Sequence, residues 1–307
     1  MSLVLRFVAA LGILLLVVGC DTSPPPPPVT AAPEGIATTF YPITDFARRI
    51  AGDLVEVVCP LPDDEDPIFW SPSDEAIRAY QAARVILVNG AGFEQWVSRV
   101  SLPRDRVVET AARLDAPFIT YQSMTHQHGL GGAHTHEGID GHTWVDPVNA
   151  VAQADVILDA VVKAWPDHAA TFRTNHAALV ADLRTLDARL VALAPRMRET
   201  TVLCSHPAYN YLARRYGWTV TNFGLDPEAP LSDADIDAIV ARIGPPDRPT
   251  LLLWESAPLA ASVSALEAAG IRNVVFSPME HAPDGGRDYV AAMRDTIAAL
   301  AASVGAE

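Results

Sequence analysis

Imidazole and carboxylate side chains recur directly after the predicted strands of this 307-residue chain. They are Asp63-Asp64-Glu65-Asp66, Ser205-His206 and Glu280-His281, which follow the apolar runs 55–59, 201–204 and 274–276. A further histidine, His142, precedes the apolar pair Trp144-Val145. Because ligands of parallel α/β sheets bind beyond the carboxyl ends of the strands, we expect these side chains to converge. Neutral imidazole nitrogen and carboxylate oxygen together suit zinc or another divalent transition metal.

Each of these groups also has an ordinary structural interpretation when it is taken alone. The acidic run fits a solvated loop, and His206 fits a buried histidine whose hydrogen bonds are satisfied. His142 fits a hydrogen-bonding residue at a helix entry, and Glu280 and His281 fit the surface. The placement of all of them after successive strands is the stronger signal, and it favours one shared site.

A histidine-rich segment gives a second signal for metal binding. Five of the nine histidines lie within residues 126–142, and two His-x-His pairs, His126/His128 and His134/His136, stand among glycines. The segment 123–143 lacks apolar periodicity and predicts a mobile loop. Such a tract can chelate borderline-soft cations weakly and exchange them fast, so these four histidines are candidate auxiliary ligands. The alternative is a polar insert without a role.

The first twenty residues form a separate segment whose sequence pattern is typical of a secretory signal. Arg6 precedes an unbroken apolar run, Phe7–Val18, that is too short for a comfortable membrane span. The run ends in Val17-Val18-Gly19-Cys20, which resembles a bacterial lipobox and predicts lipidation of Cys20. Residues 21–35 contain five consecutive prolines and predict an extended tether. The alternative is a plain signal peptide or a short anchor helix.

Charge and motifs exclude several functions. The net charge of −15 argues against the basic surface that nucleic-acid binding requires, and it suits a cationic ligand. The sequence contains no nucleophile elbow, Walker loop, His-Glu-x-x-His or dinucleotide-binding glycine motif, so we expect no enzyme. Three cysteines are too few for a disulfide scaffold, and whether Cys59 and Cys204 pair stays open.

The order of predicted elements indicates an α/β protein with two lobes. Short apolar strands alternate with helices in residues 36–147, and the same alternation restarts in residues 198–307. Between them, residues 148–197 predict connecting helices, the second of which, 167–193, has leucines at spacings of three and four. We therefore expect two parallel-sheet lobes, joined by one long connecting helix, with a metal cleft between them.

At several places the sequence resembles the zinc/manganese-type solute-binding lipoproteins of ABC importers, over about residues 36–305. The motifs that carry the resemblance are Thr38-Thr39-Phe40-Tyr41-Pro42, Pro72-Ser73-Asp74, Gly141-His142-Thr143-Trp144-Val145-Asp146-Pro147 and Ser205-His206-Pro207-Ala208-Tyr209. The resemblance implies that His142 and His206 are metal ligands. The family's first ligand is usually a histidine after Asp-Pro, and here the count back from Pro72 gives Asp66, or Glu65 after a shift of one residue. For the family's fourth ligand, a carboxylate near the last strand, the candidates are Glu280 and Glu255.

This resemblance implies an exported, lipid-anchored and monomeric protein that captures a divalent cation and delivers it to the membrane permease of an ABC importer. We favour zinc because of the histidine-rich segment, although two carboxylates among the ligands would admit Mn²⁺ or Fe²⁺ more readily. Rival interpretations are a manganese or iron member of the same family, a metal-storage or adhesin lipoprotein, and a zinc hydrolase.

Overall fold

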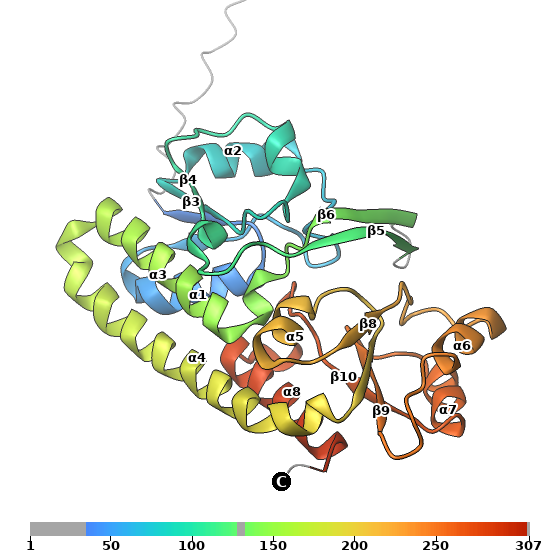
Figure 1. Ribbon diagram of the computed structural model, residues 1–307. Coiled ribbons are helices and arrows are strands. Elements are labelled where there is room, and N and C mark those ends of the chain that lie inside the picture. Colours follow the sequence, from blue (N-terminus) through green and yellow to red (C-terminus); the bar gives the residue numbers. More distant parts are fainter. Residues whose placement is uncertain (1–34, 128–132, 306–307) are drawn as a thin grey trace, which may run out of the picture. The chain divides into compact units, whose positions relative to one another are not determined.

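The fold contains two four-stranded parallel sheets, seen in the upper and lower halves of Figure 1. A computed structural model describes residues 35–127 and 133–305, and for residues 121–127 and 133–137 it describes the backbone alone. The first sheet has the order β2-β1-β3-β4, with the bounds Ile36–Thr38 (β1), Val57–Val58 (β2), Val85–Val88 (β3) and Val107–Glu109 (β4). The second has the order β10-β9-β7-β8, with the bounds Thr201–Cys204 (β7), Val220–Asn222 (β8), Thr250–Trp254 (β9) and Ile271–Val275 (β10).

We call residues 36–146 the N-terminal lobe and residues 200–305 the C-terminal lobe. In the N-terminal lobe, α1 (Tyr41–Ala51) starts with Pro42 in its first turn, where a missing N–H costs nothing. The next helix, α2 (Asp74–Ala82), is capped by Ser73, whose hydroxyl accepts a hydrogen bond from the Ala76 N–H at 3.2 Å. Both helices turn apolar faces to the sheet.

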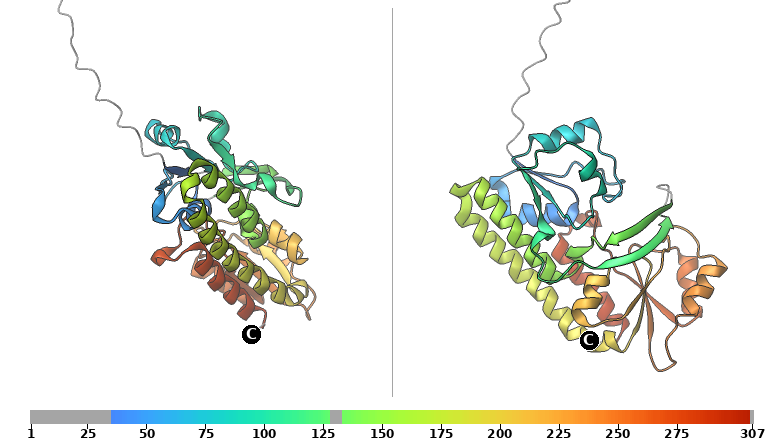
Figure 2. Two further views of the ribbon diagram at one scale, coloured as in Figure 1. Left: turned by 90° about the vertical axis from the view of Figure 1, so that its left-hand side faces the viewer. Right: turned by 45° about the horizontal axis from the view of Figure 1, so that its top comes forward.

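Two long helices follow the N-terminal lobe, and the second of them extends along both lobes (Figures 1 and 2). The first, α3 (Pro147–Ala164), is capped by the Asp146 side chain. The second, α4 (Ala169–Arg198), packs against α1 and α3 and also against α5 and α8 of the C-terminal lobe. Its predicted end at residue 193 was too early, because Ala194 and Met197 continue the buried stripe past Pro195. The prediction of two α/β lobes joined by a long helix is confirmed.

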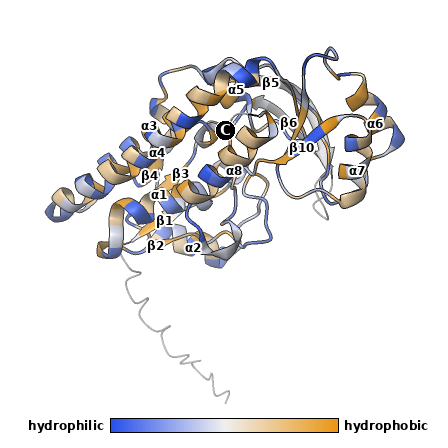
Figure 3. Ribbon diagram, turned by 90° about the horizontal axis from the view of Figure 1, so that it is seen from below, coloured by the Kyte–Doolittle hydropathy of each residue, from blue (hydrophilic) through white to orange (hydrophobic). Residues whose placement is uncertain are grey.

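The C-terminal lobe is completed by four helices with the bounds Asn210–Tyr216 (α5), Asp233–Val240 (α6), Ala260–Ala268 (α7) and Tyr289–Ser303 (α8). Ser232 and Asp235 form a reciprocal capping box at the start of α6. Short 3-10 turns lie at Gly52–Leu54, Gln95–Arg99, Thr110–Arg113, Thr143–Val145, Pro166–His168 and Asp284–Gly286. In Figure 3 the helices are hydrophobic on some faces and hydrophilic on others, as expected for elements that cover a sheet on one side only.

The histidine-rich segment differs from its prediction. Instead of a mobile loop over residues 123–143, the structure has two antiparallel strands, β5 (Thr120–Gln127) and β6 (Ala133–Ile139). Strand β5 begins at Thr120 and pairs with β6 rather than with the first sheet. Backbone pairing with a partner strand stabilises this polar segment although it lacks an apolar repeat.

The lobes share one large cluster of buried side chains. It includes Phe40 and Trp144 of the N-terminal lobe, Leu183 of α4, and Phe276 and Tyr289 of the C-terminal lobe. Cys59 and Cys204 are both free thiols. Among the described residues, no helix combines the length and the apolar character that crossing a bilayer would require.

Candidate metal centre

Three side chains predicted as metal ligands meet where the two lobes join. His142 lies between β6 and the 3-10 turn Thr143–Val145, His206 follows β7, and Glu280 follows β10. The imidazoles of His142 and His206 are buried, with 1% and 3% of their surface exposed, and Glu280 is partly exposed. His206 and Glu280 thus lie beyond the carboxyl ends of strands of the second parallel sheet, as predicted, whereas His142 follows β6 of the separate two-stranded pair.

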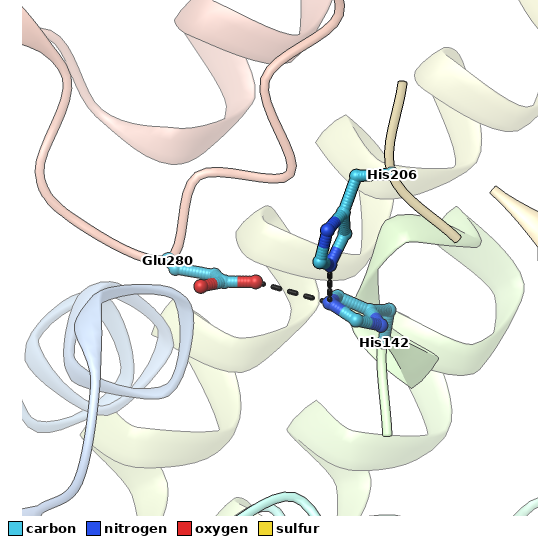
Figure 4. Close-up of side chains that lie close together, drawn as sticks. All are labelled: His142, His206 and Glu280. Carbon is cyan, nitrogen blue, oxygen red and sulfur yellow. Dashed lines mark hydrogen bonds and ion pairs between the residues drawn. The ribbon is translucent and has the colours of Figure 1, made fainter. Parts of the chain in front are cut away.

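Donor atoms of these three side chains all lie within 4.8 Å of one another (Figure 4). The Nε2 atoms of His142 and His206 are 3.3 Å apart, and His142 Nε2 lies 3.0 Å from Glu280 Oε1. A tetrahedral zinc ion bound at about 2.0–2.1 Å holds two nitrogen ligands roughly 3.3–3.4 Å apart. The separation of the two imidazole nitrogens therefore fits a shared ion.

The other ring nitrogen of each histidine faces a second carboxylate. Asp140 Oδ1 lies 2.9 Å from His142 Nδ1, and Glu255 Oε2 lies 3.2 Å from His206 Nδ1. Glu255 thus stands on the side of the His206 ring that is turned away from His142. This geometry favours Glu280 over Glu255 as the carboxylate that faces the ion, while Glu255 fits the outer partner that metal-binding histidines commonly have.

Asp66 lies outside the group of three but close to it. Burial and the charge of Glu280 raise the pKa of Asp66 to about 6, against the lowering effect of the Ile68 and Phe69 backbone N–H groups. Glu65 is exposed on the same loop. The structure therefore favours Asp66 over Glu65 at this position. The resemblance would place a histidine directly after Asp66-Pro67, but this position holds Ile68. Its side chain is 5% exposed and packs in the shared core.

The charge state of His142 depends on its neighbours. Burial lowers its pKa, but hydrogen bonds and charge interactions with Asp140 and Glu280 outweigh burial and raise the pKa to about 10. Without an ion, both ring nitrogens of His142 therefore carry a proton at neutral pH, with Nδ1 facing Asp140 and Nε2 facing Glu280. A cation that binds there replaces the Nε2 proton and meets the same two negative charges.

Aromatic rings enclose His142 on one side. The rings of Phe93 and Trp144 have centroids 5.9 and 5.5 Å from that of His142. Gly141 allows this close approach, because a Cβ added there would lie 2.8 Å from Phe93 Cβ. Thr143 and Gly141 are held in turn by Asn89, which donates from Nδ2 to Gly141 O at 2.9 Å and accepts at Oδ1 from the Thr143 hydroxyl. The backbone around His142 is thus fixed by packing and by hydrogen bonds.

Three of the predicted auxiliary histidines lie on strands: His126 on β5, and His134 and His136 on β6. His126 and His134 are directly opposite in the antiparallel register, and His136 is opposite Met124. Because side chains alternate along a strand, these register positions belong to one face of the strand pair. His128 and Cys20 lie outside the described residues.

Sequence reasoning missed Asp140, which holds His142, and gave Glu255 only as an alternative ligand. The Asp-x-His spacing of Asp140 and His142 was a local signal that could have found the first. A cavity of about 560 Å³ between β2 and α2, lined in part by Cys59, Ala76 and Ala79, contains none of the candidate ligands. The strongest candidate site is the buried group between the lobes.

Comparison with known proteins identifies the family. A family described as "Zinc-uptake complex component A periplasmic" (ZnuA) matches residues 36–303. The chain belongs to the ZnuA family. The match covers both lobes and the connecting helices, so the resemblance noted in the sequence is confirmed.

Individual relatives are distant. A zinc-binding lipoprotein, AdcA of Streptococcus pneumoniae, is 28% identical over 275 residues, which are 86% of this chain and 54% of AdcA. The chain thus spans about half the length of the first relatives it matches. The high-affinity zinc uptake system protein ZnuA of Bacillus subtilis is 25% identical over 296 residues, 93% of each chain.

Solved structures share the fold. The metal-dependent lipoprotein YcdH of Bacillus subtilis superposes with a TM-score of 0.74 at 23% identity, over 87% of this chain and 97% of that one. Zn(II)-bound AdcA of Streptococcus pneumoniae gives a TM-score of 0.72 at 25% identity, over 89% of this chain and 58% of that one.

Proposed function

We propose that this ZnuA-family protein captures Zn²⁺ between its lobes, with His142, His206, Glu280 and Asp66 as ligands, and makes or breaks no covalent bond. The single observation that carries the proposal is the 3.3 Å separation of the His142 and His206 Nε2 atoms, which come from different lobes. Two imidazoles with two carboxylates give a closed set of four ligands of the types that zinc prefers.

Zinc is the cargo that the donor set and the relatives support together. Imidazole nitrogen favours zinc over the harder Mn²⁺, whereas each carboxylate shifts the balance back. The relatives from Streptococcus pneumoniae and Bacillus subtilis are named as zinc-binding and zinc-uptake proteins. We take Mn²⁺ and Fe²⁺ as weaker competitors for the same ligands.

Delivery to a permease follows from the family rather than from a surface of this chain. We propose that the protein works outside the cytoplasm, held to the membrane by a lipid on Cys20, and hands its ion as a monomer to the permease of an ABC importer. The lipobox-like end of the leader and the proline tether support this arrangement. The histidines of β5 and β6 would collect zinc weakly and exchange it fast.

Substitution of each histidine tests the proposal. Binding of Zn²⁺ to the full chain is measured by competition with a chelator of known affinity, for the wild type, His142→Ala and His206→Ala. We expect either variant to lose more affinity than the roughly 10–100-fold that follows loss of an outer partner. His176→Ala, which removes an imidazole paired with Asp155 on the long helices, is the control and should bind like the wild type. Unchanged affinity in His206→Ala would remove that residue from the site.

A further inference from the structure

Asp140 is a buried carboxylate that joins the candidate ligand His142 to the opposite lobe. It has no exposed surface, and Oδ1 accepts hydrogen bonds from both the backbone N–H and Nδ1 of His142, at 3.0 and 2.9 Å. Its other oxygen, Oδ2, accepts from Asn210 Nδ2 at 2.9 Å. One oxygen therefore holds the imidazole of the N-terminal lobe, and the other is held by the first residue of α5 in the C-terminal lobe.

The orientation of the Asn210 amide is fixed by its other partners. Asn222 Nδ2 donates to Asn210 Oδ1 at 2.9 Å, so the Asn210 oxygen is used within the C-terminal lobe. The Nδ2 group also donates to Pro207 O at 3.1 Å, directly after His206. Tyr211 adds a second hydrogen bond between the same two segments, because its hydroxyl donates to the backbone oxygen of Asp140 at 2.8 Å. The N-terminus of α5 thus holds Asp140 at two points.

We propose that Asn210 is a positioning residue that acts through Asp140 to hold His142 Nε2 toward the ion. The position of the C-terminal lobe thereby controls the alignment of a ligand in the N-terminal lobe. The inference rests on the function proposed above. A carboxylate on Nδ1 fixes the ring orientation of a metal-binding histidine and leaves Nε2 for the metal. The carboxylate itself needs a fixed position, and here the opposite lobe supplies it.

This arrangement gives a physical route from lobe movement to release of the ion. A small separation of α5 from Asp140 breaks the Asn210 hydrogen bond before either histidine has moved far. The His142 ring then loses the support that kept it aligned, and one ligand loosens while the core between the lobes stays packed. No wide opening of the two lobes is needed, which suits lobes that share the long helix α4.

A double-mutant cycle tests this relay, by which we mean the hydrogen bonds from Asn210 through Asp140 to His142. Zn²⁺ affinity of the full chain is measured by chelator competition for the wild type, Asn210→Ala, Asp140→Ala and the double variant. We expect Asp140→Ala to weaken binding roughly 10–100-fold and Asn210→Ala to weaken it less. Because Asn210 acts through Asp140, its substitution should have no further effect in the Asp140→Ala background. Asn175→Ala is the matched control, since this asparagine donates to Ile50 O at 3.1 Å far from the centre.

A second readout separates positioning from a general structural effect. In the protein loaded with Co²⁺, the solvent-exchangeable ring N–H protons of the coordinating histidines give shifted NMR signals. We expect the His142 Nδ1–H to exchange faster with water in Asn210→Ala, while the His206 signal keeps its wild-type rate. Should Asn210→Ala fail to fold, Asn222→Ala, which releases the Asn210 oxygen, should show the same change to a smaller extent.

The outcomes distinguish this inference from the proposed function. If the wild type binds neither Zn²⁺ nor Co²⁺ stoichiometrically, the proposed function fails. If the wild type binds and Asn210→Ala leaves both affinity and N–H exchange unchanged, the relay is wrong. The relay is also wrong if Asn210→Ala weakens binding equally in the presence and absence of the Asp140 carboxylate.

Discussion

Glu255 Oε2 lies 3.2 Å from His206 Nδ1, whereas the Nε2 atom of the same ring faces His142. The two nitrogens of one imidazole thus separate an outer carboxylate from the group that would hold the ion. Asp140 and His142 repeat the arrangement in the other lobe. Both histidines therefore have a carboxylate at Nδ1 and turn Nε2 toward each other, so we expect Glu255 and Glu280 to have different roles.

Amide substitution should separate these two roles. Glu280→Gln removes a charged oxygen that faces His142 Nε2 at 3.0 Å, and Glu255→Gln removes one that faces away from the ion. We expect Glu255→Gln to weaken Zn²⁺ binding by about tenfold, as for other outer partners, and Glu280→Gln to weaken it considerably more. Chelator competition on the two variants provides the comparison. A larger loss in Glu255→Gln would make Glu255 the ligand.

The Trp144 indole should help to hold the segment that carries Glu280. Its Nε1 donates to Pro278 O at 2.7 Å, across the lobe boundary. Trp144→Phe leaves that buried oxygen without its donor, so we expect a loss of about 1–3 kcal/mol in the free energy of unfolding. We also expect faster Zn²⁺ dissociation, measured by stopped-flow chelation, because Glu280 follows Pro278 by two residues.

The matched control for this variant lies within the C-terminal lobe. Trp254 Nε1 donates to Asn273 Oδ1 at 2.9 Å, so Trp254→Phe removes a comparable hydrogen bond without touching the boundary. It should lower stability by a similar amount and leave the dissociation rate unchanged. Equal dissociation rates in the two variants would show that the Trp144 hydrogen bond has no specific effect on the ion.

Asp45 on α1 should make the stability of the protein depend on pH. Burial and the charge of Asp288 raise its pKa to about 6, while Arg48, Arg49 and the Tyr289 backbone N–H act in the opposite direction. Its pKa is higher in the folded than in the unfolded chain, so the unfolded chain releases this proton first. Stability is therefore lost as the pH rises from about 4 to about 6.

The Asp45→Asn variant should escape this loss. A rise of this size corresponds to about 3 kcal/mol, so we expect the stability of the variant relative to wild type to increase by about that amount between pH 4 and pH 7. Urea unfolding at the two pH values measures the change. Asp53→Asn, at an exposed position, is the control. A relative stability that is constant with pH would contradict a raised pKa at Asp45.

The histidines of β5 and β6 should bind zinc independently of the buried group. His126, His134 and His136 occupy register positions on one face of the strand pair. We expect their joint replacement by Asn to abolish a weak second zinc equivalent in calorimetry while the tight equivalent stays. The variant His168→Asn/His176→Asn, which removes one histidine of the 3-10 turn Pro166–His168 and one of α4, should keep both equivalents. Loss of the tight equivalent in the first variant would place those histidines in the main site.

Sequence alone predicted the fold well where burial dominates. The apolar run 201–204 has the same bounds as β7, because a buried strand of a parallel sheet appears as a continuous apolar segment. Residues 120–139 were misjudged, since pairing between β5 and β6 depends on a partner strand and not on an apolar repeat. The end of α4 was also misjudged, because its last turn is buried by tertiary packing past a proline.

The candidate site was predictable only in part. His142 and His206 stood in motifs, and the position of His206 directly after a predicted strand indicated a ligand-binding edge of the sheet. The choice of Asp66 over Glu65 depended on which side chain the loop exposes, and the choice of Glu280 over Glu255 depended on which ring nitrogen each faces. Such choices arise from contacts between residues far apart along the chain, which spacing does not encode.

X-ray absorption at the zinc edge of the full chain, loaded with one equivalent of Zn²⁺, tests the central claim most directly. The account predicts two imidazole nitrogens at about 2.0–2.1 Å with oxygen donors and no sulfur, and loss of one imidazole in His142→Ala and in His206→Ala. A spectrum with sulfur ligands, or one that both substitutions leave unchanged, would contradict it.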